Sequence, residues 1–244
     1  MRASKTLFAA SAFALVSLGS LAAEAYCRTS SCSGNITGAV CVPALGTDCG
    51  VPLKWPTDCV GFSLQQDASL QANLDETQAI FERAFATWMN ADCGNGTPRI
   101  KVKYGGAVAC GEHEYNQDQG NANAVVYRDA GWPHPGQNST LALTTVTYNL
   151  DTGEIYDADM ELNSSGITFS TTDVEADVTF DLLSVVTHEA GHFLGLSHSQ
   201  TKAATMAPDY LPGSMDLRDL DPDDVAGICA IYPPGAEIPS TCSI

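Results

Sequence analysis

Residues 188–198 read His-Glu-Ala-Gly-His-Phe-Leu-Gly-Leu-Ser-His. His188 and His192 are four residues apart, so their imidazoles project from one face of a helix and can bind one metal ion. Gly195 can adopt a positive φ, which ends the helix and reverses the chain. His198 can therefore return to the same ion. Three imidazoles that leave one coordination position open are typical of a catalytic zinc site.

Glu189 stands next to the first of these ligands. Its carboxylate can accept a proton from water at the metal without being a ligand itself. Three of the chain's five histidines fall in this stretch at ligand spacing. The alternative, surface histidines on an amphipathic helix, would not require that spacing. The stretch therefore predicts zinc on the three histidines, with Glu189 as the catalytic base.

The composition is that of an acidic globular protein. Of the 244 residues, 44% are hydrophobic and 16% are charged, and the formal net charge is -18. Basic residues are too scarce to form a stripe that neutralises phosphates, so we expect no nucleic-acid partner. Strong acidity favours solubility and helps to hold divalent cations. We expect a monomer.

Residues 1–25 resemble a secretory signal peptide. Arg2 and Lys5 form a basic start, the stretch from Leu7 to Leu21 is mostly small and apolar, and Ala23-Glu24-Ala25 offers a cleavage site. A membrane anchor is the alternative, but the apolar run is short and is interrupted by serines and a glycine. We therefore expect a secreted, extracellular protein without a membrane partner.

The cysteines divide the rest of the chain. Residues 26–54 hold four of the nine cysteines and show no hydrophobic period, which predicts a Cys-rich extension or a short pro-segment. Residues 55–236 form the expected catalytic domain, and residues 237–244 a tail. An exported chain with an odd number of cysteines should contain disulfides and one leftover thiol. Spacing does not give the pairing, although a Cys59–Cys93 bridge is one candidate.

Hydrophobic periodicity predicts an α+β domain with a mostly five-stranded sheet. Asp75 can cap an early helix, Asp181 the helix that carries the zinc ligands, and Asp221 a C-terminal helix. The expected strands are residues 60–64, 100–104, 124–128, 141–148 and 154–163.

The last of these strands carries acids on one face. Asp157, Asp159 and Glu161 alternate with apolar residues. Three neighbouring carboxylates repel one another unless water solvates them or a cation bridges them. Two interpretations remain open, a plain solvated face and a calcium site.

From about Trp55 to Pro234, the chain resembles the matrixin branch of the metzincin zinc endopeptidases. The zinc motif matches, as do Ser199 after the third histidine and Met206 further on. Pro208-Asp209-Tyr210 resembles the family's S1′ wall. The segment from Leu220 to Tyr232 is similar to its terminal helix.

The resemblance implies a metzincin fold in which Met206, in a Met-turn, forms a hydrophobic base beneath the zinc. It also implies that Leu141–Thr147 is an edge strand for an extended protein or peptide substrate, with Pro208 and Tyr210 lining a specificity pocket. The family's second, structural zinc uses a histidine where this chain has Asp159, so we expect only the catalytic zinc. The implied form is a secreted, bacterial-type enzyme without a hemopexin-like domain.

The sequence thus favours a secreted zinc-dependent endopeptidase. Two alternatives stay open: a non-catalytic zinc-bearing binding or adhesion protein, and a metallohydrolase of a non-peptide amide. The intact Glu189 disfavours the first, since holding metal does not require that acid.

Cys49-Gly50-Val51-Pro52 resembles the core of the matrixin cysteine switch, in which a thiolate takes the open zinc position. Zinc binds thiolate well, so Cys49 is a candidate latency thiol. A disulfide with Cys41 or another neighbour is the competing interpretation.

Overall fold

The computed structural model describes residues 26–31, 51–118, 120–236 and 238. Its centre is a five-stranded sheet with the strand order β3-β2-β4-β6-β5. The first four strands in this order run parallel, and β5 runs antiparallel to β6 at the sheet edge. The strands are β2 (Cys59–Gln65), β3 (Lys101–Val108), β4 (Ala124–Tyr127), β5 (Ala142–Tyr148) and β6 (Ile155–Leu162).

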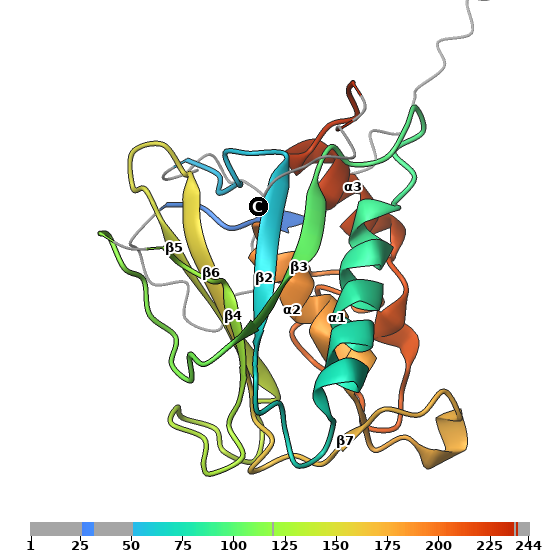
Figure 1. Cartoon of the computed structure of the whole chain (residues 1–244). Helices are drawn as coiled ribbons and strands as arrows, with labels where there is room; N and C mark the ends of the chain where they lie inside the picture. The colour runs from blue at the N-terminus through green and yellow to red at the C-terminus, as the bar shows by residue number, and fades with distance from the viewer. Residues whose placement is uncertain (1–25, 32–50, 119, 237, 239–244) are drawn as a thin grey trace, which may run out of the picture.

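Three α-helices complete the domain: α1 (Leu74–Met89), α2 (Leu182–Phe193) and α3 (Pro222–Ile231). Figure 1 shows them together on one side of the sheet, with α1 and α2 packed beside each other. The expected α+β class, the five strands and all three helices are confirmed.

The early helix begins differently from the prediction. Asn73, not Asp75, is the N-cap, and its side chain accepts a hydrogen bond from the Glu76 amide. Asp75 instead lies in the first turn, where its charge still favours the helix dipole. The cap prediction was wrong because both residue types cap helices well and stand two positions apart.

The core forms where the apolar face of α1 meets α2 and the sheet. Phe85 of α1 lies between two other rings, with centroids 5.1 Å from Phe62 of β2 and 5.0 Å from Phe193 of α2. All three side chains are buried. Trp88 joins the two helices by donating its indole N–H to the Thr187 carbonyl of α2, at 2.8 Å.

Short elements frame this core. They are the strands β1 (Cys27–Arg28), β7 (Phe169–Ser170), β8 (Phe180–Asp181) and β9 (Leu196–Ser197), and the 3₁₀ helices η1 (Glu175–Asp177) and η2 (Asp216–Arg218). Strand β1 pairs antiparallel with β9, which directly precedes His198. The described part of the N-terminal extension therefore supports the loop that carries His198.

The acidic face of β6 is not a solvated face. Ala158, Met160 and Leu162 point into the core with the helices, so the acids point to the opposite side. Asp157 and Asp159 are 2% and 4% exposed. Glu161 is fully buried. The solvated interpretation was wrong because the segments flanking β4 cover this face, which strand alternation alone does not reveal.

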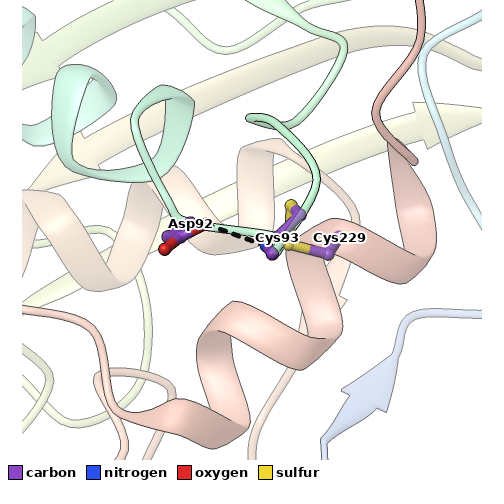
Figure 2. Close-up of a disulfide and its surroundings, with 4 residues drawn as sticks. Asp92, Cys93 and Cys229 are labelled. Carbon is purple, nitrogen blue, oxygen red and sulfur yellow. Dashed lines mark hydrogen bonds between the residues drawn. A yellow bond between two sulfur atoms is a disulfide. The ribbon is translucent and has the colours of Figure 1, made fainter.

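The disulfide prediction was also wrong. Cys93, just after α1, pairs with Cys229 of α3, with a Cα–Cα distance of 5.7 Å (Figure 2). Cys59 takes part in a different disulfide. Among the described cysteines, Cys110 is the free one. The two cysteines are 136 positions apart in the sequence, and their bridge joins the end of α1 to α3.

Replacing Cys93 and Cys229 together by alanine should lower the free energy of unfolding by about 2–5 kcal/mol, because the cross-link closes a long loop in the unfolded chain. Urea unfolding without reductant measures the loss. Cys110→Ala is the matched control and should leave stability nearly unchanged. Equal stability of the double variant and the control would contradict this role.

Candidate active site

Helix α2 carries two of the three predicted metal ligands, His188 and His192. Its N-cap, Asp181, accepts hydrogen bonds from the Ser184 amide and hydroxyl at 2.9 and 2.7 Å. The same buried carboxylate pairs with Arg218, which anchors the helix start to η2. This cap fixes where the helix begins, and therefore which face carries His188 and His192 toward the cleft.

The imidazoles of α2 are oriented for a metal. His188 donates its Nδ1–H to the Thr205 carbonyl at 2.7 Å, and His192 donates its Nδ1–H to the Leu196 carbonyl at 2.9 Å. Because a carbonyl can only accept, the Nε2 atoms carry the lone pairs, and they lie 3.1 Å apart. Tetrahedral zinc with Zn–N bonds of about 2.0–2.1 Å would separate such nitrogens by about 3.3 Å. The donor set therefore fits a zinc ion.

His198 completes the group. The ligand atoms of the three histidines all lie within 4.8 Å of one another. Gly195 makes this possible with a φ of +96°, and a Cβ there would lie 2.7 Å from the Leu53 carbonyl oxygen. The predicted turn is confirmed, and the close approach of Leu53 gives a second reason for glycine.

Burial keeps the three imidazoles neutral. Desolvation lowers the pKa of His188, His192 and His198 to about 4 each, and the neighbouring histidines act in the same direction. Neutral imidazole is the form that coordinates metal. The site is therefore ready for metal at neutral pH without losing protons first.

Glu189 lies inside the cleft with only 6% of its surface exposed. Its Oε2 accepts a hydrogen bond from the Thr144 hydroxyl of β5, at 2.6 Å. Burial raises the pKa of this carboxyl, whereas His192 and the Thr144 hydrogen bond lower it. Thr144 therefore orients the predicted base and favours its ionised form.

Met206 packs against Gly191 of α2, the helix that carries the first two predicted zinc ligands. It is buried, and a Cβ on Gly191 would lie 2.2 Å from its sulfur. Asp224 of α3 holds this turn by accepting the amide N–H groups of Thr205 and Met206. This turn also orients His188, because the Thr205 carbonyl accepts a hydrogen bond from the Nδ1–H of His188.

A cleft of about 890 Å³ opens over the metal site. The edge strand β5 forms one of its walls, and residues 207–210 contribute to another. Pro208 and Tyr210, the residues of the predicted S1′ wall, both line this cleft. The Tyr210 hydroxyl is fixed between the Asp181 amide at 2.8 Å and the Ser214 carbonyl at 2.6 Å.

The predicted acidic residues are brought together but divided into two sets. Asp157 lies beside Asp159, which accepts the Ala124 amide N–H at 2.6 Å. Glu161 instead meets Arg128 and His134. The predicted signal peptide and Cys49 lie outside the described residues.

Several residues of these sites were missed in the sequence. Thr144, Asp224 and His134 come from segments distant from the zinc motif, and no local pattern joins them to it. Asp224 lies in the segment from Leu220 to Tyr232, and the similarity of that segment to the family's terminal helix was the one signal that pointed to it.

Gly191→Ala should destabilise the site, because the new methyl group would lie 2.2 Å from the Met206 sulfur and 2.8 Å from a Trp88 ring carbon. Overpacking of this kind costs about 1–3 kcal/mol of unfolding free energy. Urea unfolding and a chelator competition for zinc measure both consequences. Met206→Ala removes the first clash, so the double variant should lose less than the sum of the single losses. If the losses of unfolding free energy in the two single variants simply added in the double variant, the packing of Met206 against Gly191 would be contradicted.

The comparisons with known proteins agree with this geometry. The matrixin family model matches residues 54–233. Metalloendoproteinase 1-MMP of Arabidopsis thaliana is 28% identical over 197 residues, covering 76% of this chain and 46% of the relative. Metalloendoproteinase 2-MMP of the same plant is 32% identical over 166 residues, covering 65% and 37%. Matrix metalloproteinase-C of Caenorhabditis elegans is 26% identical over 217 residues, covering 82% and 32%.

The chain spans less than half the length of each of these relatives. The family model, however, covers most of this chain, from the segment before β2 to the end of α3. The chain therefore belongs to the matrixin family of peptidases.

Proposed function

We propose that the protein is a zinc-dependent endopeptidase. The observation that carries this proposal is the position of Glu189, buried in the cleft beside three converging neutral imidazoles. A protein that only held zinc would not need a buried, oriented carboxylate at that point, because the burial of a charge is unfavourable unless it is compensated.

Zinc bound by His188, His192 and His198 would supply Lewis-acid chemistry in the cleft. Glu189 accepts a proton from the attacking water and delivers it to the leaving amine. Thr144 holds the carboxylate in place through its hydroxyl during both transfers. The matrixin relatives named as metalloendoproteinases support the same assignment.

An extended peptide is the substrate that this cleft suits. Strand β5 lines the cleft and occupies the sheet edge, with β6 on its other side. A substrate backbone can add to such an edge as a further strand, with side chains in adjoining pockets. Pro208 and Tyr210 would border one of these pockets. This mode favours peptides over other amides.

Export is part of the proposal. The signal-like composition of residues 1–25 and the Cys93–Cys229 disulfide support an oxidising compartment. Within the described residues, no helix has the length and apolar character needed to cross a membrane.

Glu189→Gln should keep zinc and lose casein digestion by about 10²–10⁴-fold, because the amide cannot accept the proton while the three ligands remain. Glutamine can still accept the Thr144 hydrogen bond, so the local structure should persist. Zinc analysis and peptide turnover on one preparation test this, with chelator-treated wild type as the reference. Near-normal turnover by the variant would exclude Glu189 as the base.

We also propose calcium at the acidic face, centred on Asp157 and Asp159. One oxygen of Asp157, Oδ1, is buried without a hydrogen-bond partner among the described residues. Calcium prefers oxygen ligands and would satisfy it. Without a cation, a proton on one of the two carboxyls must relieve the repulsion between Asp157 and Asp159. Burial, followed by the neighbouring Asp159, raises the pKa of Asp157 to about 7.

The raised pKa predicts a pH dependence of stability. The folded state binds this proton more tightly than the unfolded state, so its contribution to stability is lost as the pH rises from 3.8 to about 7. Asp157→Asn should flatten the fall of melting temperature over this range, whereas Asp67→Asn, at an exposed position, should not. Millimolar calcium should raise the melting temperature of the wild type above neutral pH. An unchanged melting temperature would end the calcium proposal.

A further inference from the structure

The two histidines outside the zinc motif meet each other at Glu161. His113 lies between β3 and β4, and His134 lies between β4 and β5. Their ligand atoms and the carboxylate oxygens of Glu161 lie within 4.8 Å of one another. His134 Nε2 is 2.7 Å from Glu161 Oε2, and His113 Nδ1 is 3.2 Å from the same oxygen. All five histidines of the chain therefore belong to two clusters.

Glu161 is held so that one oxygen stays available. Its carboxylate is fully buried, and Oε1 accepts a hydrogen bond from Arg128 Nε. Oε2, the remaining oxygen, faces the two imidazoles. Trp132 packs edge-on against His134 with a ring-centroid distance of 4.9 Å, which fixes that imidazole. Metal ligands are commonly oriented in this way by surrounding groups.

We propose that His113, His134 and Glu161 bind a divalent transition-metal ion, with zinc as the probe of choice. Two imidazoles and one carboxylate are a donor set that zinc uses, and they leave a fourth position for water. The open side exists here, because the side chains of His134 and His113 are 24% and 39% exposed. Zinc would need only a few tenths of an ångström more between His134 and Glu161 than the present contact.

The donor set separates this site from the other metal proposals. Calcium prefers oxygen ligands, whereas imidazole favours zinc, nickel and copper. The site also differs from the family's second zinc site, whose histidine is replaced by Asp159 in this chain. Here Asp159 is engaged with the Ala124 amide.

Arg128 is the main opposing charge, because one of its terminal nitrogens lies 3.5 Å from His113 Nδ1. It is partly offset by Glu112, 3.3 Å from that guanidinium. Arg128 also donates to the Gly111 carbonyl at 2.8 Å, which positions the segment that carries His113. We therefore expect weaker zinc binding here than at the catalytic site.

The expected role is to tie two long connections to β6. The connection that carries His134 leads directly into β5, and its residues Asn138, Ser139 and Thr140 line the substrate cleft. Metal at this site would therefore stabilise one wall of the cleft from the opposite face of the sheet.

The test counts metal in two backgrounds. In full-length Glu189→Gln protein, in which we expect little self-digestion, equilibrium with buffered micromolar zinc should give two ions per chain. Adding His134→Gln or His113→Gln should leave one. In a His188→Gln, His192→Gln background, one ion should remain, and zinc should still raise the melting temperature. Adding His134→Gln to that background should abolish both the remaining zinc binding and the rise in melting temperature. Circular dichroism of each variant checks that it is folded.

The proposal would be overturned if the Glu189→Gln protein bound one zinc ion, or if it still bound two ions after either His134→Gln or His113→Gln was added. Displacement of the second zinc by millimolar calcium would also overturn it. The second background separates this inference from the proposed function. If it keeps one zinc while wild-type protein fails to digest casein, the endopeptidase proposal fails and the second site stands.

Discussion

The buried carboxylate of Asp224 is the contact on which the catalytic geometry depends. It accepts three backbone amides, from Thr205, Met206 and Asp221, so it joins the start of α3 to the turn beneath the metal site. Burial raises the pKa of this carboxyl, while the three hydrogen bonds lower it. A carboxylate that compensates three amides in the interior fixes their positions closely, because leaving any of them unpaired would be unfavourable.

Asp224 affects the geometry of the predicted metal site through two residues of this turn, Thr205 and Met206. The Thr205 carbonyl orients His188, and Met206 fills the space that Gly191 leaves under α2. The Cys93–Cys229 disulfide then ties α3 to the end of α1, whose Trp88 also contacts α2. Helix α2 is therefore positioned by both of the other helices, which suits a site in which three histidines would share one ion.

Local patterns gave the sequence predictions that were confirmed. The convergence of the three histidines, the positive φ of Gly195 and the alternation of five strands depend on near neighbours in the chain. The predictions that were wrong depend on distant ones. The partner of Cys93 lies 136 residues away, and the burial of the β6 acids comes from segments before and after β4. The prediction that Asp75 caps α1 was wrong for another reason. Asn73, two residues earlier, is an equally good N-cap residue.

The two faces of β6 have different roles: one is apolar and belongs to the core, and the other carries the three acids. Its apolar face packs on α2 and contributes to the core that supports the proposed catalytic residues. Its acidic face needs compensation, which at Glu161 comes from the charge of Arg128 and from a hydrogen bond with His134. Strand β5 pairs with β6 along its length, from Ala142–Leu162 to Tyr148–Ile155. Any cation that orders the acidic face must therefore also order the edge strand, and with it the wall against which a peptide would lie.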